Sequence, residues 1–309
     1  LTPWYATCNR FPVSLAAQQT KQGERMKKYL TSMIALIALS GSIYAEKVIY
    51  VHGMSLTESN AHCQDTKDCA YWESHVGGDY VFVGYDGRQN PFGGTDVSGS
   101  VRLLQLLNKY CRKDQGQSCR LIDDSLGGFT GAGTVSMYNK TGLYNILYVT
   151  QIVSAEGGSE IANLGDTAID ILKVVFNLNG DGAQALIDSH SAIQALVTTS
   201  ARALFDHNRS NGTVFYHVNA NKSFFLADPF LPGTDDSLVA FHSSCGYRTT
   251  GAFSKCMGEK IRSCALCFWE TPKLITPFDN HKMHPLVPLT GIDIPHAQGH
   301  HDVRYHGAL

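Results

Sequence analysis

The stretch Cys119-Arg-Leu-Ile-Asp-Asp-Ser-Leu-Gly-Gly128 decides the fold class. Its first five residues have the character of a short buried strand, which leads directly into Ser125 and two glycines. A helix is predicted after this turn, to about residue 138. Such a turn holds a serine hydroxyl at the carboxyl end of a sheet, and the free N–H groups of the helix N-terminus favour a developing negative charge. Ser125 is therefore a candidate nucleophile, although taken singly it also fits a helix cap.

Strands and helices alternate on both sides of this turn. The sequence predicts further strands at 47–51, 80–85, 144–153 and 214–218 and a helix at 101–111, where apolar residues recur at helical spacing. Residues 160–206 contain no strand candidate and read as long helices with a break at 179–182. The predicted fold class is therefore α/β, a mostly parallel sheet flanked by helices with a helical cap at 160–206.

The composition excludes several classes of protein. The chain has 309 residues, of which 43% are hydrophobic and 17% charged, and a formal net charge of −2. This is enough apolar material for a large core, and it excludes disorder, collagen and coiled coil. With no excess of basic residues to neutralise phosphates, we expect no nucleic-acid partner.

The N-terminal residues have the pattern of an export signal. Residues 1–25 show no periodicity and are interpreted as upstream sequence or a disordered lead. Residues 26–45 combine a basic start, a short apolar run and a small-residue cleavage site after Ala45, which is typical of a signal peptide; an N-terminal membrane anchor is the alternative. These 45 residues carry five basic residues and one acidic residue, so their removal shifts the net charge from −2 to −6. We expect a secreted or periplasmic domain over 46–309.

Cysteines are frequent in this chain. Of the nine cysteines, eight lie beyond residue 45, and an even number in an exported protein favours disulfides. Local spacing favours the pairs Cys63–Cys69 and Cys111–Cys119. The other four pair among themselves or, alternatively, form a zinc site, since two of them have ligand spacing: Cys245, Cys256, Cys264 and Cys267.

Four segments together carry a resemblance to a known family. Val48-Ile-Tyr-Val-His-Gly-Met54 resembles an oxyanion strand, and Ser125-Leu-Gly-Gly128 resembles a nucleophile elbow. Gly158-Ser-Glu-Ile-Ala162 is similar to a segment of bacterial lipases, and Asp236-Ser-Leu-Val239 to the segment that bears their catalytic acid. The chain thus resembles the α/β-hydrolase superfamily, in particular secreted bacterial lipases and esterases.

The resemblance implies a catalytic triad. Ser125 would be the nucleophile, Asp236 the acid and His300 the base, with His301 as the close alternative. Two further histidines are more remote alternatives, His296 and His306. Two backbone N–H groups, those of Met54 and Leu126, would form the oxyanion hole.

The resemblance also guides what the protein would bind. No cofactor is expected, and Asp302 is a candidate ligand for a structural calcium ion, as in some lipases. We expect an ester or lipid substrate and a monomeric protein. Contact with a lipid surface is compatible with such a substrate. Leucines, isoleucines, Phe176 and Phe205 in the helical block would form an apolar cover over Ser125 or, equally, only pack on the sheet.

The elbow departs from the family pattern Gly-x-Ser-x-Gly. Asp123 stands where the first glycine belongs, and Asp124 precedes the serine. A carboxylate beside the nucleophile would raise the pKa of the histidine and oppose an oxyanion. Three interpretations remain: a serine ester hydrolase with an adapted elbow, a catalytically impaired hydrolase fold that binds a ligand or partner, and, more weakly, a thiol enzyme.

Overall fold

The computed structural model describes residues 46–56, 58–72, 76, 78–218, 220, 227, 229–231, 235–240, 243–244 and 296. All of them belong to one unit of the chain, Ala45–Leu309. The predictions for residues 1–45 and for Cys245, Cys256, Cys264 and Cys267 lie outside these residues.

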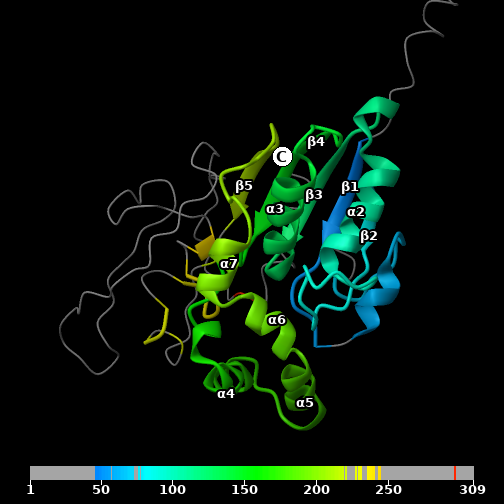
Figure 1. Cartoon of the computed structure of the whole chain (residues 1–309). Coiled ribbons are helices and arrows are strands. Elements are labelled where there is room, and N and C mark those ends of the chain that lie inside the picture. The colour runs from blue at the N-terminus through cyan, green and yellow to red at the C-terminus, as the bar shows by residue number, and fades with distance from the viewer. Residues whose placement is uncertain are drawn as a thin grey trace, which may run out of the picture. The chain divides into compact units, whose positions relative to one another are not determined.

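A five-stranded sheet forms the centre of the described structure (Figure 1), and every pair of neighbouring strands is parallel. Its order is β2-β1-β3-β4-β5. The strands are β1 (Lys47–Val51), β2 (Asp79–Val83), β3 (Cys119–Asp124), β4 (Ile146–Ile152) and β5 (Val214–Val218). The predicted α/β class with a parallel sheet is confirmed.

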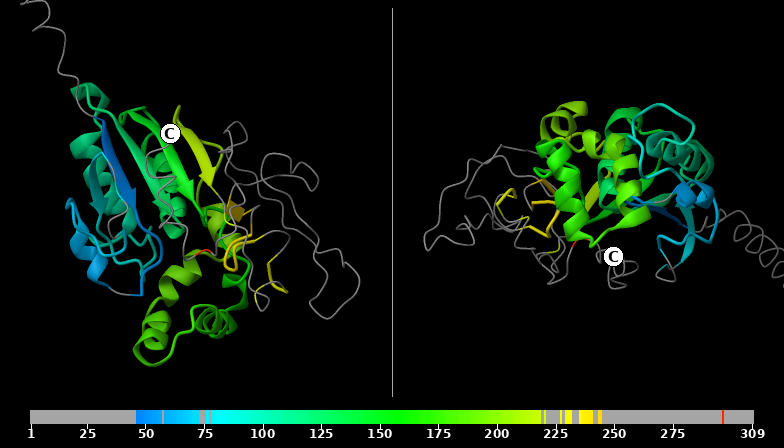
Figure 2. Two further views of the ribbon diagram at one scale, coloured as in Figure 1. Left: turned by 180° about the vertical axis from the view of Figure 1, so that it is seen from behind. Right: turned by 90° about the horizontal axis from the view of Figure 1, so that it is seen from below.

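Two helices cover one face of this sheet, α2 (Gly99–Tyr110) and α3 (Leu126–Tyr138) (Figure 1). The view from behind shows the strands in front of these helices (Figure 2). Apolar side chains of α2, α3 and the strands form one core cluster on this face, and a second cluster around Tyr50 and Trp72 lies on the other. Both faces are buried, which is why the strands are continuous apolar runs rather than alternating ones.

The helical block lies beyond the carboxyl ends of the strands (Figure 1). It contains α4 (Asp166–Val175), α5 (Gly180–Asp188), α6 (His190–Ala195) and α7 (Thr198–Leu204). The prediction of long helices here is wrong. Ser189 caps both the end of α5 and the start of α6, and Val197, with φ −56° and ψ 124°, is not helical, so the chain turns at each point.

Short 3-10 helices and two disulfides complete the described structure. The 3-10 helices are η1 (Glu58–Cys63), η2 (Lys113–Gln115) and η3 (Ala162–Leu164). Cys63 is bonded to Cys69 and Cys111 to Cys119, as the spacing predicted. Within the ranges given above, no helix has the length and apolarity needed to cross a membrane.

Candidate active site

Ser125 stands at a sharp turn between β3 and α3. Its backbone has φ 52° and ψ −117°, a conformation that costs a non-glycine residue about 1–3 kcal/mol and is characteristic of functional sites. Hydrogen bonds on both sides hold the turn. The Ser125 N–H donates to the carbonyl of Ile152 at 2.9 Å, and the Ser125 carbonyl accepts from the N–H groups of Gly128 and Ala155, each at 3.0 Å.

Two glycines make room for this turn. A Cβ atom on Gly127 would overlap the carbonyl of Val51 in β1, so the residue two after the serine has to lack a side chain. A Cβ atom on Gly131, one turn into α3, would overlap the carboxyl group of Asp123. The family pattern has a glycine two residues before the serine, where this chain has the larger Asp123. Because Gly131 has no side chain, it leaves the space that the Asp123 carboxyl group occupies.

The side chain of Ser125 begins a chain of hydrogen bonds through two further residues. Ser125 Oγ lies 2.6 Å from Nε2 of His296, and His296 Nδ1 lies 2.7 Å from Oδ2 of Asp236. The backbone N–H of His296 also donates to the carbonyl of Asp236 at 3.0 Å. The other carboxylate oxygen, Asp236 Oδ1, accepts from the N–H groups of Leu238 and Val239 at 3.1 and 2.8 Å.

His296 therefore stands where the resemblance led us to expect His300. His300, His301 and His306 lie outside the described residues. His296 was only a remote alternative, because spacing along the sequence does not separate six histidines that lie within 26 positions of one another. The two contacts between His296 and Asp236, one from the ring and one from the backbone, give the physical reason for preferring His296 as the third member of the site.

The charge state of His296 depends on two carboxylates. Burial opposes a charged imidazole, but the charge and hydrogen bond of Asp236, together with the charge of Asp124, outweigh it and raise the pKa of His296. In the neutral form, with its proton on Nδ1, this ring presents a free lone pair on Nε2 to the serine hydroxyl.

Asp124 precedes Ser125 and accepts a hydrogen bond from a tyrosine. Burial raises the pKa of the Asp124 carboxyl to about 7, although a hydrogen bond from the Tyr71 hydroxyl and the charge of His296 lower it. Trp72, next to Tyr71, packs edge-on against Tyr50 with ring centroids 4.9 Å apart, and the backbone N–H of Trp72 donates to the carbonyl of Cys69. Nothing in the sequence links residue 71 to residue 124, so sequence reasoning missed this contact.

Asp123 belongs to a buried acidic group below the turn. Burial, followed by the charges of Glu156 and Asp124, raises the pKa of Asp123 well above its ordinary range. Within the described residues neither carboxyl oxygen of Asp123 has a hydrogen-bond partner, whereas Glu156 Oε1 lies 3.0 Å from Nδ1 of His207. Burial therefore favours the neutral, protonated form of Asp123 over a carboxylate below Ser125.

The expected oxyanion residues border Ser125. Leu126 is the first residue of α3, so its N–H has no acceptor inside the helix. The segment before Met54 is fixed by His52, whose ring stacks on Tyr85 with centroids 3.9 Å apart. Burial lowers the pKa of His52 to about 4, so this ring is neutral and structural. Met54 and Ser125 line the same cavities.

Two cavities meet at Ser125 and His296. The first is almost entirely apolar, and Leu172, Ile193 and Leu196 of the helical block line it. The second is bordered by a cluster of side chains that includes Tyr71, Asp124 and Phe176.

The sequence left open whether Phe176 and Phe205 cover Ser125 or only pack on the sheet, and the structure gives one phenylalanine in each place. Phe176 borders a cavity beside Ser125, as a cover would. Phe205 instead packs against Phe129 in the core, with ring centroids 5.6 Å apart.

No group of three or more acidic, histidine or cysteine side chains suited to a metal ion occurs in the part of the chain that the structure describes. Asp302, the candidate calcium ligand, lies outside that part.

Comparison with known proteins gives distant likenesses in structure. No protein-family model and no curated protein matches the chain. A lipase of Bacillus licheniformis, BlEst2 in its mature form, is 16% identical over 66% of this chain and 80% of its own, with a TM-score of 0.46. The metagenomic carboxyl esterase MGS0156 is 15% identical over 66% of this chain and 61% of its own, with a TM-score of 0.41. Phospholipase PlaB from Legionella pneumophila is 16% identical over 65% of this chain and 45% of its own, with a TM-score of 0.43.

The last two matches span less than two thirds of those proteins. The fold assignment consequently rests on this chain's own geometry, which is the parallel sheet, the strained serine between β3 and α3, and the glycine packed on β1. On these grounds the protein has an α/β-hydrolase fold.

Proposed function

We propose that the protein is a serine hydrolase that cleaves carboxylic esters through an acyl-enzyme, with Ser125, His296 and Asp236 as its catalytic triad. The observation that carries this proposal is the continuous hydrogen-bond chain, 2.6 Å from Ser125 Oγ to His296 and 2.7 Å from His296 to Asp236, on a strained turn at the carboxyl edge of the sheet. These are the contacts that a nucleophile, its base and the group that orients the base require.

In the proposed mechanism His296 Nε2 takes the proton of the Ser125 hydroxyl as its oxygen attacks the ester carbonyl. Asp236 keeps the other ring proton on Nδ1 and stabilises the imidazolium. The N–H groups of Met54 and Leu126 would bind the oxyanion, and each such donor contributes about 3–4 kcal/mol in comparable sites. His296 then protonates the leaving alkoxide, and water attacks the acyl-enzyme by the same steps.

The apolar cavity favours an ester with an aliphatic acyl chain, so we propose lipids as the substrate class. Leu172 and Ile193 line it with aliphatic carbons, and the hydroxyl of Ser159, which also lines it, is bonded to the carbonyl of Leu238. The two disulfides favour an oxidising compartment, and they support the proposal that the protein acts after export.

A fluorophosphonate probe and a panel of p-nitrophenyl esters of increasing chain length test the function. The wild type should be labelled and Ser125→Ala should not, and kcat/KM should rise with acyl length before it falls. A folded wild type that neither takes the label nor cleaves any ester would reject the hydrolase and favour the impaired, ligand-binding alternative.

Replacement of the histidine tests the assignment of the base. His296→Gln should lower kcat about 10⁴-fold, because the serine loses its proton acceptor. A loss of that size in His300→Gln, with His296→Gln nearly unaffected, would return the role to His300.

A further inference from the structure

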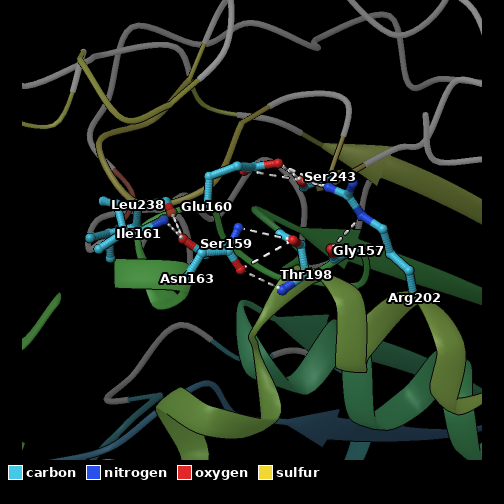
Figure 3. A network of polar contacts seen from close by, with 9 residues as sticks. All are labelled: Gly157, Ser159, Glu160, Ile161, Asn163, Thr198, Arg202, Leu238 and Ser243. Carbon is cyan, nitrogen blue, oxygen red and sulfur yellow. Dashed lines mark hydrogen bonds and ion pairs between the residues drawn. The ribbon is translucent and has the colours of Figure 1, made fainter. Parts of the chain in front are cut away.

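The Gly158-Ser-Glu-Ile-Ala162 segment takes no part in the proton transfers proposed above, although Ser159, Ile161 and Ala162 line the apolar cavity. It follows β4, and its polar side chains Ser159 and Glu160 both point to neighbours rather than to solvent (Figure 3). The residues around them come from α7 and from the segment that carries Asp236 (Figure 3). The network therefore joins the end of the sheet, the cap and the acid.

Ser159 is bonded to the peptide group that serves Asp236. The Ser159 hydroxyl is buried and donates to the carbonyl of Leu238 at 2.5 Å. The N–H at the other end of that same peptide, which belongs to Val239, donates to Asp236 Oδ1 at 2.8 Å. A peptide group is planar and rigid, so fixing its carbonyl also fixes the direction of its N–H. Ser159 thus acts on Asp236 through one intervening peptide plane.

Arg202 holds the same segment at a second point. Its Nε donates to the carbonyl of Gly157 at 2.9 Å, and one terminal nitrogen donates to Glu160 Oε1 at 2.9 Å and to Ser243 Oγ at 2.8 Å (Figure 3). The Gly157 N–H donates to the carbonyl of Ser243 at 2.7 Å. The guanidinium is largely buried, and its flat fork bonds three groups that a lysine could not reach together.

We propose that Ser159 is a positioning residue for Asp236, and that the Glu160–Arg202 ion pair fixes the segment on which Ser159 stands. The inference rests on the proposed function, since it assumes that Asp236 is the acid of the triad. Two N–H groups occupy Asp236 Oδ1 and leave Oδ2 to His296. When the Leu238–Val239 peptide turns, Oδ1 loses a donor, the carboxylate rotates, and the histidine is no longer held toward Ser125.

The variant Ser159→Ala tests this step. We expect kcat to fall about tenfold with KM nearly unchanged on a short-chain ester, since loss of alignment acts on the chemical step. The acidic limb of the kcat/KM profile should move to lower pH, because a misaligned Asp236 no longer raises the pKa of His296 as strongly. Asp124, the other carboxylate that faces this histidine, is unaltered. Ser159→Thr, which keeps the hydroxyl, should recover most of the lost rate.

Asn163 provides a matched control in the same cluster. Among the described residues its side chain hydrogen-bonds to Thr198 alone, at 2.9 and 3.0 Å, and so forms no hydrogen bond with the segment that carries Asp236 (Figure 3). Each of the two variants, Ser159→Ala and Asn163→Ala, removes side-chain hydrogen bonds and should lower the melting temperature. Asn163→Ala should nevertheless leave kcat and the pH profile unchanged. Equal effects of the two variants on kcat, or a wild-type rate in Ser159→Ala, would overturn the proposal.

Arg202→Lys covers the case in which Ser159→Ala does not fold. It keeps the charge beside Glu160 but loses the fork, so kcat should fall severalfold and the acidic limb should shift in the same direction. Unchanged kinetics in Arg202→Lys would also overturn the proposal. A wild type that cleaves no ester would instead reject the proposed function itself, so the two failures are distinguishable.

Discussion

Replacing Asp124 by asparagine should change how the stability of the protein depends on pH. The carboxyl is buried next to Ser125, and its pKa rises from 3.8 to about 7. Below pH 4 the folded and unfolded states both hold the proton. Between about pH 4 and 7 only the folded state holds it, so the free energy of unfolding falls as pH rises. Above pH 7 both states are ionised, and the loss is complete.

The size of this loss follows from the pKa difference. One pKa unit corresponds to about 1.4 kcal/mol, so the rise from 3.8 to about 7 predicts a loss of about 4 kcal/mol for the wild type by pH 8. An asparagine does not titrate, and its amide oxygen still accepts a hydrogen bond from Tyr71. Asp124→Asn should therefore be more stable than the wild type at pH 8 and lose less stability between pH 4 and pH 8.

Urea unfolding with intact disulfides, at a series of pH values from 4 to 8.5, measures the effect. The other buried carboxyl groups are common to both proteins, so the difference between the two curves isolates Asp124. Asp181→Asn, which removes an exposed carboxylate on α5, controls for the loss of a negative charge as such. Parallel curves for wild type and Asp124→Asn would refute the assignment of a raised pKa to Asp124.

Three further predictions concern the turn, a disulfide and the rate. Gly131→Ala should destabilise the protein by about 1–3 kcal/mol in urea unfolding, because the added methyl group overlaps Asp123; combining it with Asp123→Ala should recover most of the loss, and no recovery would contradict the contact. The double variant Cys63→Ala, Cys69→Ala should lose about 2 kcal/mol of its free energy of unfolding, because the disulfide closes a short loop in the unfolded chain. An unchanged free energy of unfolding would contradict this. The acidic limb of kcat/KM should lie above pH 6.5, because the pKa of His296 is raised from that value and its neutral form is the base; a limb below pH 6.5 would argue against this.

The sheet was predictable because each strand is a short apolar run. Strands 47–51 and 214–218 were predicted with the bounds that the structure has. The strand predicted at 80–85 ends at Val83, because Gly84 turns to pack on the backbone of Gln64 and its N–H bonds to the Gln64 side chain. Local patterns of hydrophobicity set the strands, and contacts between distant residues set where they end.

The site was predictable only where its residues stand in sequence motifs. Ser125 follows from a strand that runs into glycines, and Asp236 from the resemblance of its segment. His296 depends on a pairing across 60 residues, and Tyr71 on a contact across 53, and neither leaves a mark in local sequence. For this reason the histidine expected from the family motif differs from the one that meets Ser125.

The wide separation of Ser125, Asp236 and His296 along the chain also bears on when the proposed site can form. Ser125 follows β3, which pairs with β4 only a few tens of residues away in the sequence. Its contact with His296, by contrast, closes a span of 171 residues. Contacts of such high order form late in folding. A nascent chain that has not yet reached residue 296 lacks the histidine that meets Ser125. In the proposed hydrolase the triad can therefore be complete only after synthesis has passed residue 296.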